Sequence, residues 1–438
     1  MKRHQLANLL DWKNARSRKP LIIKGARQVG KTWLMQTFGT AHYKQSVYLN
    51  FEKNARMRSL FNDDFDMQRV IIALQAETGK VIDKNNTLLI FDEIQAAPRA
   101  ITALKYFCED APGYHVVAAG SLLGVALHAN ISFPVGKVDF LDLHPMNYQE
   151  FLMALGEEGL LQILDSGDWK LINAFKTKFI DRLRQYYYVG GMPEAVKNFS
   201  ENHDFVEVRH IQKQILTAYE QDFSKHPPVN IVPRIRMLWN SIPSQLAKEN
   251  RKFIYGLIRQ GARAKDYEMA LSWLVDCGQV HKVTRITKPV IPLKAYEEMG
   301  AFKLYLVDIG LLAAMGDIDA KTLLEGNAIF EEFKGALTEQ YVLQQMVCDE
   351  DLTIHYWTAD RSMAEVDFVL QYNGKVVPLE VKAEENLQAK SLKVYQQKFR
   401  PALALRLSMS DYRTSDWLVN LPLYAISMLK QVAGKKNA

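Results

Sequence analysis

The sequence predicts a fold of the α/β class for the first third of the chain. Short apolar runs at residues 21–23, 46–50, 88–91 and 115–119 are typical of strands, and stretches of helical periodicity separate them. This alternation indicates βαβ units, in which a parallel sheet is buried on both faces. The composition, with 48% hydrophobic and 24% charged residues, is that of a globular protein and excludes a disordered or fibrous chain.

The remaining residues predict further parts after this core. At roughly 150 residues per domain, a chain of 438 residues has room for about three domains. We place the α/β core in residues 1–155 and a helical extension, rich in aromatic residues, in 156–229. Residues 230–330 read as short helices that end in a strand pair. Residues 331–438 read as a helix, strands and a final helix, without an internal repeat or a low-complexity linker to mark the boundaries.

The cysteine content and the hydropathy of the sequence indicate the cellular compartment of the protein. Cys108, Cys277 and Cys348 lie far apart and form no Cys-x-x-Cys pair, which excludes a disulfide framework and a cysteine-rich zinc module. The first twenty residues lack the apolar stretch of a signal peptide. The longest apolar run, at residues 116–127, is broken by Ser121 and is too short to span a bilayer. We therefore expect a cytoplasmic protein with no membrane segment.

The strongest motif follows the first strand. Residues 25–32 match Gly-x-x-x-x-Gly-Lys-[Ser/Thr] between a strand and a helical stretch, which is the context that the motif requires. The glycines let backbone N–H groups surround phosphate oxygens, Lys31 reaches the β- and γ-phosphates, and Thr32 ligates Mg²⁺. The predicted ATP-binding residues are Gly25, Ala26, Arg27, Gln28, Val29, Gly30, Lys31, Thr32 and Trp33, with Ser121 added below.

Two adjacent acids end the third strand. Asp92 is expected to join Thr32 around Mg²⁺, and Glu93 to act as the catalytic residue that polarises the attacking water. Two neighbouring buried acids would be costly without a metal, which favours this role over a structural one. The next strand ends at Gly120 and Ser121, where Ser121 is placed to sense the γ-phosphate. A serine in an ordinary turn explains that position equally well.

These motifs, on successive strands, resemble those of an AAA-type ATPase with its phosphate (P-) loop. Two phrases, Tyr-Tyr-Val-Gly-Gly-Met-Pro-Glu at 187–194 and Phe-Lys-Leu-Tyr-Leu-Val-Asp-Ile-Gly-Leu-Leu at 302–312, resemble a prokaryotic family. In that family an AAA-type ATPase precedes a C-terminal domain of unknown function. The resemblance covers nearly the whole chain and implies ATP binding and hydrolysis, but it implies no particular substrate.

The chain departs from the family at one charged position. A positive residue that often follows a glycine in the family is Lys137 here, and a lysine cannot make the bidentate contacts of an arginine finger. The cation supplied in trans to the γ-phosphate is therefore left open among Arg99, Lys137 and Arg182.

The middle segment resembles a winged helix-turn-helix. Residues 253–259 read as a helix, 260–262 as a turn and the residues from Arg263 as a second helix, with Gly278 as its C-cap before a strand. Residues 230–288 carry eleven Lys and Arg against four acids, in a chain of net charge +6, which favours contact with DNA. An interdomain spacer stays open as the alternative, because the second helix also carries acids. The predicted DNA-contacting residues are Arg263, Lys265, Lys282 and Arg285.

The last hundred residues predict a carboxylate site on a hairpin. Two alternating strands flank Asn373 and Gly374, and Asn-Gly is the strongest short signal of a two-residue hairpin turn. In that register Asp367 lies opposite Glu380, and Glu365 lies opposite Lys382, all on one face. Two carboxylates about 5 Å apart beside a lysine form a divalent-metal site that can position a hydroxide.

This arrangement is the pattern of the PD-(D/E)XK nuclease fold. Asp367, Glu380 and Lys382 are the predicted catalytic residues, and Asp367 and Glu380 the metal ligands, with Glu339 added from the preceding helix. Three alternatives remain. Pro378 would shift the register if it formed a bulge. Exposed cross-strand pairs of an acid and a lysine are common on sheets. The nuclease fold is also often retained for binding alone.

Two functions from different classes follow. The first is an ATP-hydrolysing protein that acts on DNA through the winged-helix segment and a Mg²⁺-dependent, nuclease-like C-terminal domain. The second is a signalling or scaffold ATPase whose C-terminal domain docks a protein partner without cleavage. ATP and Mg²⁺ are the expected ligands of either, and a homo-oligomer is left open. Protease and esterase functions are excluded, because no His-Glu-x-x-His or Gly-x-Ser-x-Gly motif occurs.

Overall fold

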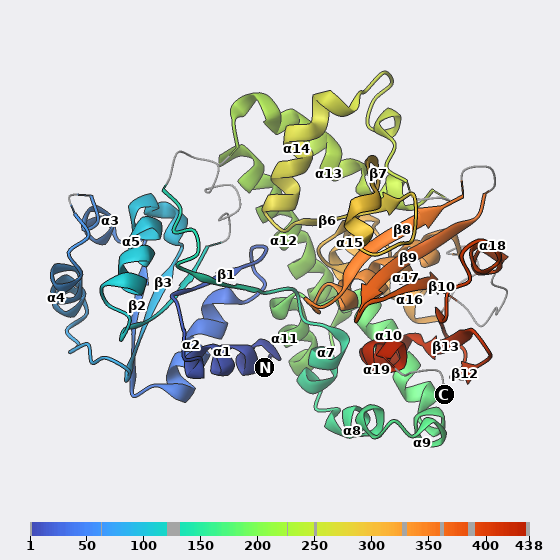
Figure 1. Ribbon diagram of the computed structural model, residues 1–438, viewed down its shortest axis with the longest axis horizontal. Helices are drawn as coiled ribbons and strands as arrows, with labels where there is room; N and C mark the ends of the chain where they lie inside the picture. Colours follow the sequence, from blue (N-terminus) through green and yellow to red (C-terminus); the bar gives the residue numbers. More distant parts are fainter. Residues whose placement is uncertain are drawn as a thin grey trace. The chain divides into compact units, whose positions relative to one another are not determined.

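The computed structural model describes residues 2–62, 64–120, 132–225, 227–248, 252–325, 331–359, 363–383 and 390–434 (Figure 1). The chain divides into two compact units. The first unit holds Lys2–His144 with Asp276–Gln279, and the second holds Pro145–Val275 with Val280–Ala438. Among the helices within the described ranges, none is both long and apolar enough to cross a membrane.

The first unit is an α/β fold on a parallel sheet with the strand order β2-β3-β4-β1-β5. Every residue of β3 and β4 is buried, as a sheet covered on both faces requires. The predicted α/β class is therefore confirmed, and its four expected strands are present. The sequence pattern misses β5, because only one of its four residues is buried and no continuous apolar run marks it. The strands are β1 (Leu21–Lys24), β2 (Gln45–Asn50), β3 (Thr87–Asp92), β4 (His115–Ala119) and β5 (Asp139–Asp142).

Helices connect these strands and bring their ends together. Because all five strands run in the same direction, the carboxyl ends of β1 and β3 meet at one edge of the sheet. The residues that follow β1 and those that end β3 therefore belong to one site. The described helices of this unit are α1 (Gln5–Asn14), α2 (Lys31–His42), α3 (Ala55–Ser59), α4 (Met67–Thr78), the short η1 (Ile94–Ala96) and α5 (Pro98–Glu109).

The second unit begins with a run of helices and continues into a mixed sheet. The first helices are α7 (Tyr148–Ala154), α8 (Glu158–Ser166), α9 (Trp169–Ala174), α10 (Lys176–Val189), α11 (Pro193–Asn202), α12 (Phe205–Lys225), α13 (Val232–Leu246) and α14 (Ala264–Asp276). The later helices are α15 (Ile309–Met315), α16 (Ala320–Glu325), α17 (Glu331–Met346), α18 (Lys390–Phe399) and α19 (Leu429–Gly434).

The sheet of the second unit has the strand order β12-β13-β11-β10-β9-β8-β6-β7. It joins strands on both sides of residue 330, where the sequence suggests a boundary, and the four-part division of the chain stays a prediction. The strands are β6 (Val280–Ile286), β7 (Glu297–Leu306), β8 (Thr353–Thr358), β9 (Glu365–Tyr372), β10 (Lys375–Val381), β11 (Ala404–Ser408), β12 (Arg413–Thr414) and β13 (Leu418–Pro422).

The two phrases that carry the family resemblance meet inside the second unit. Asp308 is fully buried, and its Oδ2 accepts hydrogen bonds from Gly191 N at 2.6 Å and Gln344 Nε2 at 2.8 Å. Gly190 has a φ of 71°, and a Cβ there would lie 2.2 Å from Asp308 Oδ1. Burial raises the pKa of Asp308, while the Gly191 N–H opposes that shift. The phrases are therefore needed for packing between α10 and α15.

The segment expected to form a winged helix differs from that expectation in two ways. The expected first helix is a single 3₁₀ turn, η3 (Tyr255–Leu257), since Gly256 disfavours helix and so short a segment does not offset the cost of nucleation. The β6–β7 hairpin is not a free wing, because β6 also pairs with β8. The second helix, α14, forms as expected, and Gly278 follows it with a φ of 69°. The winged-helix assignment itself stays a prediction.

The C-terminal hairpin has the expected register. Strands β9 and β10 pair antiparallel around a turn at Asn373 and Gly374, which both have positive φ angles of 46° and 71°. Pro378 lies opposite Val369 without a bulge, so the register does not shift. The assignment of this region to the nuclease fold stays a prediction.

Candidate functional site

The loop of residues 25–32 joins β1 to α2 at the carboxyl edge of the parallel sheet. Gly25 has a φ of 140°, and a Cβ there would lie 2.1 Å from Leu143 O. Gly30, with a φ of 95°, is the N-cap of α2. Backbone N–H groups and the start of a helix suit an anion such as a nucleotide phosphate. The loop contains Ala26, Arg27, Gln28 and Val29, and the first turn of α2 contains Lys31, Thr32 and Trp33.

Lys31 is buried and bonded to the loop itself. Its Nζ donates to Gly25 O at 2.8 Å and Ala26 O at 2.7 Å. Burial lowers the pKa of Lys31 to about 8, and the nearby charges of Glu93 and Asp92 oppose that shift. A buried ammonium inside a loop of this shape fits a triphosphate, whose negative charge would replace the backbone carbonyls as its partner.

Asp92 ends β3 and is 3% exposed. Its Oδ2 accepts hydrogen bonds from Thr32 Oγ1 at 2.7 Å and Tyr48 OH at 2.8 Å. Thr32 and Asp92 therefore lie together, as expected for residues that hold Mg²⁺, which would neutralise phosphate charge when bound. Sequence reasoning misses Tyr48, whose pKa burial raises to about 12. Its only signal is an aromatic residue at a half-exposed position of the strand beside β3.

Glu93 starts the tight turn after β3. Its backbone is left-handed with a φ of 50°, and its N–H donates to Asp92 Oδ1 at 3.1 Å. Its Oε2 accepts a hydrogen bond from Gln95 Nε2 at 2.5 Å. The position beside Lys31 and Asp92 suits a water-polarising carboxylate. Sequence reasoning misses Gln95 as well, and the predicted Ser121 lies outside the described residues.

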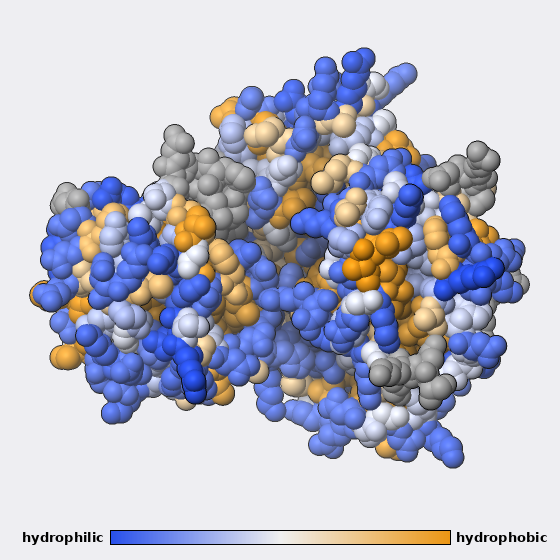
Figure 2. Space-filling model, in the orientation of Figure 1, coloured by the Kyte–Doolittle hydropathy of each residue, from blue (hydrophilic) through white to orange (hydrophobic). Residues whose placement is uncertain are grey.

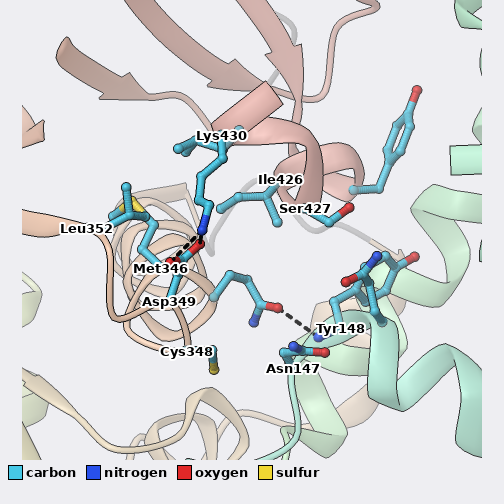
Figure 3. Close-up of a pocket in the computed structure, with 13 residues that line it drawn as sticks. Asn147, Tyr148, Met346, Cys348, Asp349, Leu352, Ile426, Ser427 and Lys430 are labelled. Carbon is cyan, nitrogen blue, oxygen red and sulfur yellow. Dashed lines mark hydrogen bonds and ion pairs between the residues drawn. The ribbon is translucent and has the colours of Figure 1, made fainter. Parts of the chain in front are cut away.

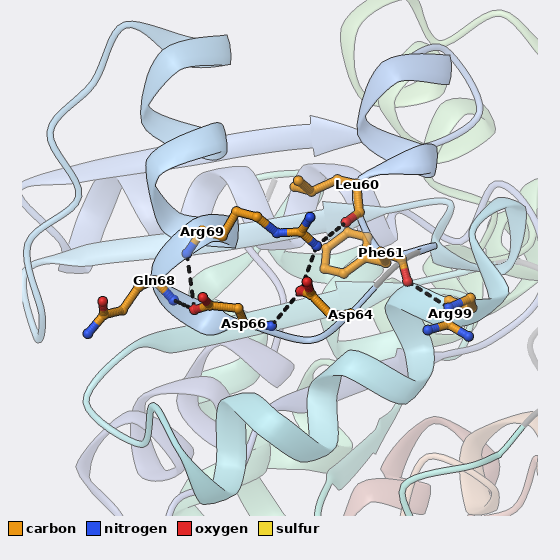
Figure 4. Close-up of polar contacts among 7 residues, drawn as sticks. All are labelled: Leu60, Phe61, Asp64, Asp66, Gln68, Arg69 and Arg99. Atoms are coloured by element: carbon orange, nitrogen blue, oxygen red, sulfur yellow. Dashed lines mark hydrogen bonds and ion pairs between the residues drawn. The ribbon is translucent and has the colours of Figure 1, made fainter.

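Three basic residues are candidates for the cation that acts in trans on the γ-phosphate. Two of them form ion pairs with acidic residues. Arg182 donates through Nε and Nη2 to Glu157 at 2.9 Å and 2.6 Å. Lys137 forms an ion pair with Glu109 at 2.8 Å. Arg99, near the start of α5, donates at 2.6 Å to a backbone carbonyl of the segment before α4 (Figure 4). Within the part of the chain that the structure describes, Arg99 is paired with no acid.

The C-terminal site lies on β9 and the end of β10. Asp367 Oδ2 accepts from Val381 N at 2.8 Å, and Glu380 Oε1 pairs with Lys382 Nζ at 2.8 Å. Glu380 is 3% exposed, and its Oε2 has no hydrogen-bond partner among the described residues. Burial raises the pKa of Glu380, Lys382 opposes the shift and Asp367 adds to it. The structure thus brings these three predicted residues together.

Two further acids have other partners than expected. Glu365 Oε1 lies 2.5 Å from Lys303 Nζ, which replaces the expected cross-strand pair with Lys382. Glu339 accepts from Tyr305 OH at 3.1 Å and lies 3.5 Å from the same Lys303 ammonium. Lys303, on β7, is fully buried. Sequence reasoning misses it, because β7 lies far from these acids along the chain.

The metal-ligand set is smaller than the one expected. Among the described residues, no group of three or more His, Cys, Asp or Glu side chains is placed to hold a metal ion. Glu339 is therefore not assembled with Asp367 and Glu380 as a third ligand. Arg406, on β11, is the register partner of Glu380, and its charge also opposes the rise in the pKa of Glu380. Lys382 and Arg406 thus both compensate that carboxylate.

The basic residues of the middle segment differ in their surroundings. Arg263 and Lys265 are exposed at the start of α14, and Lys282 is exposed on β6. Arg285 has a side chain only 15% exposed and forms an ion pair with Glu298 at 2.9 Å. Figure 2 shows hydrophilic side chains projecting at the top of the view, with hydrophobic residues beside and below them.

A separate pocket of about 160 Å³ lies in the second unit, lined by residues of α7, α17 and α19 (Figure 3). On one side Tyr148 N donates to Gln345 Oε1 at 2.7 Å. On another, Lys430 Nζ forms an ion pair with Asp349 at 2.8 Å. None of the residues expected at either site lines this pocket.

Comparisons with protein families divide the chain among three matches. The family described as AAA domain matches residues 17–152. A domain of unknown function (DUF8612) matches residues 180–322, and another (DUF4143) matches residues 334–426. A search of curated proteins found no match.

Three of the solved structures that resemble this chain have low sequence identity to it. The Walker-type ATPase PABY2304 of Pyrococcus abyssi is 14% identical, covers 72% of this chain and 95% of its own, and has a TM-score of 0.47. The Aeropyrum pernix ORC1 protein in complex with DNA is 12% identical over 73% and 93% of the two chains, with a TM-score of 0.27. The Thermotoga maritima RuvB Holliday junction branch migration motor is 12% identical over 68% and 94%, with a TM-score of 0.30. These likenesses assign no substrate or partner.

The parallel sheet, the glycine loop between β1 and α2 and the acids at the end of β3 define a P-loop nucleotide-binding fold. Within the P-loop class, residues 17–152 match the family described as AAA domain. The protein is an ATPase.

Proposed function

We propose that the protein uses ATP binding and hydrolysis to act on DNA, through the winged-helix segment and a Mg²⁺-dependent, nuclease-like C-terminal domain. The observation that carries this proposal is the cluster of Asp367, Glu380 and Lys382 on neighbouring strands. Two carboxylates able to hold a divalent cation, beside a lysine able to stabilise a hydroxide or a phosphate oxygen, are the groups that phosphodiester hydrolysis needs.

Glu380 supports the metal role most directly. Its Oε2 is buried without a partner among the described residues, which costs about 1–3 kcal/mol. Its pKa is raised, chiefly by burial, and Asp367 adds like charge. A divalent cation held by both carboxylates would satisfy the oxygen and remove the repulsion. Lys382, with 36% of its side chain exposed, remains within reach of a substrate.

ATP supplies the energy or the switch in this proposal. Lys31 binds the β- and γ-phosphates, Thr32 and Asp92 hold Mg²⁺, and Glu93 polarises the attacking water. The hydrogen bond between Thr32 and Asp92 favours this assignment, because it already brings the two Mg²⁺-binding groups together.

The DNA contact involves Arg263, Lys265 and Lys282. All three are exposed. Arg285 forms an ion pair with Glu298, and we therefore do not include it in the proposed DNA contact. Each phosphate that a basic side chain neutralises releases counterions, so DNA binding weakens steeply as salt rises. Replacing the three residues by alanine should reduce that salt slope by about three. Arg285→Ala is the matched control, and a fluorescence titration with labelled duplex gives both slopes. An unchanged slope in the triple variant would leave the segment as a spacer.

A cleavage assay tests the C-terminal site. The full chain is incubated with plasmid and linear DNA in the presence of Mg²⁺ or Mn²⁺. Lys382→Ala should bind metal but lose cleavage, because only the group beside the metal-bound water is gone. Asp367→Ala should lose both metal binding and cleavage. Metal binding with no cleavage in the wild type would reduce the proposal to DNA binding.

A second candidate function is a signalling or scaffold ATPase whose C-terminal domain docks a protein partner. Two observations favour it. The charges of Lys382 and Arg406 both compensate the Glu380 carboxylate. No group of three metal-binding side chains occurs among the described residues. The two candidates differ in one property, since only the first requires a divalent cation at Asp367 and Glu380.

A further inference from the structure

The turn after β3 holds both the backbone N–H and the side-chain carboxylate of Glu93 in hydrogen bonds. Its left-handed backbone, with a φ of 50°, costs a residue with a side chain roughly 1–2 kcal/mol. The Glu93 N–H is bonded to Asp92, and the Glu93 carboxylate to Gln95 Nε2 at 2.5 Å. Gln95 lies in η1, the 3₁₀ turn that directly follows Glu93. The carboxylate is therefore held by a side chain only two residues away.

Gln95 makes this contact at an energetic cost. A carboxylate only accepts hydrogen bonds, so the Gln95 amide must direct its NH₂ group to Glu93. Its Oε1 is then buried, and it has no partner among the described residues. Such an acceptor costs about 1–3 kcal/mol. Groups of this kind in native structures call for an explanation other than stability.

The explanation follows from where Glu93 lies. Its charge acts on the buried Lys31 ammonium, so the carboxylate lies near the phosphate loop. We infer that Gln95 is a positioning residue for ATP hydrolysis, which holds the Glu93 carboxylate in place through its Oε2. The inference rests on the proposed role of Glu93. Its physical basis is that hydrolysis requires the reacting groups to stay within a fraction of an ångström of the productive geometry.

Steady-state ATP hydrolysis and binding of a fluorescent ATP analogue by the full chain test this inference. Gln95→Ala should lower kcat by about tenfold or more, because a general base that is out of place loses part of its contribution to the rate. KM and the affinity for the analogue should stay nearly unchanged. Gln95→Glu has the same shape but directs no donor at Glu93, so it should lower kcat at least as much. A double variant supplies the deciding comparison. In a Glu93→Gln background, Gln95→Ala should change the residual rate less than twofold, because the group that it positions is already gone.

Each outcome has one meaning. If Glu93→Gln hydrolyses ATP like the wild type, the proposed role of Glu93 is wrong and the inference about Gln95 falls with it. If Glu93→Gln is inactive but Gln95→Glu keeps the wild-type kcat, only the inference about Gln95 is overturned. Equal fold losses from Gln95→Ala in both backgrounds would also overturn it, since they indicate a purely structural residue. Gln95→Glu keeps the test decisive should the alanine variant fold poorly.

Discussion

At the scale of single residues, Lys31 should make nucleotide binding depend on pH. Burial lowers its pKa to about 8, and only the protonated ammonium attracts phosphate. The affinity for a non-hydrolysable ATP analogue should therefore fall above about pH 8, by up to about tenfold per pH unit. Calorimetry at about pH 7 and pH 9 measures this, and Lys31→Arg, which stays charged throughout, is the control. Equal wild-type affinity at both values would contradict the assignment of Lys31 as a phosphate ligand.

Glu380 should make the folded protein less stable as pH rises. An ordinary ion-paired acid, whose pKa is lowered by folding, has the opposite effect. Because the folded pKa of Glu380 is raised, its stabilising contribution is complete below the ordinary carboxyl range and is lost as pH rises through the raised value. Glu380→Gln should therefore raise the unfolding temperature at about pH 8 and change it little at about pH 4. Thermal unfolding of both proteins in a chelator gives the comparison. A variant less stable than the wild type at the higher pH would show that the ionised carboxylate stabilises the fold.

At the scale of elements, the contact between α10 and α15 should be intolerant of a single methyl group. Gly190→Ala places a Cβ 2.2 Å from Asp308 Oδ1 in a left-handed conformation. We expect a loss of about 2–5 kcal/mol in unfolding free energy, from backbone strain and overpacking together. Gly156→Ala is a control with the same φ of 71° and no atom within 4 Å, so it should cost only the roughly 1–2 kcal/mol of backbone strain. Denaturant unfolding that gave equal losses would refute the packing explanation.

Structural features that depend on residues close together in the chain can be predicted from the sequence, whereas contacts between distant residues cannot. The phosphate loop, its flanking strand and helix, and the Asn373-Gly374 register follow from residues close together in the chain. Lys303 pairs with Glu365 across 62 positions, and no local pattern carries that information. The helix expected at 253–259 does not form, because Gly256 and the short length of the segment outweigh its helical periodicity. The Gln95 contact is local, but the turn that creates it depends on the left-handed backbone of Glu93.

At the scale of the whole molecule, the two sites lie in separate compact units. Asp367→Ala and Lys382→Ala should therefore leave the ATP hydrolysis of the isolated protein within about twofold of wild type. Lys31→Ala should abolish nucleotide binding yet leave Mn²⁺ binding at the C-terminal site unchanged. A coupled-enzyme ATPase assay and Mn²⁺ calorimetry on the three variants test this independence. A large loss of ATPase activity in Asp367→Ala would show that the units are coupled without DNA.

The most direct test of the proposed function is a crystal of the protein soaked in Mn²⁺, with anomalous scattering used to locate the metal. The proposal predicts one anomalous peak shared by Asp367 and Glu380, with oxygen distances of about 2.0–2.6 Å, and no peak there in Asp367→Ala. Lys382 should lie beside the metal-bound water. A wild-type crystal with no peak between the two carboxylates, and with Lys382 still paired to Glu380, would contradict the metal-dependent site and favour the partner-docking ATPase.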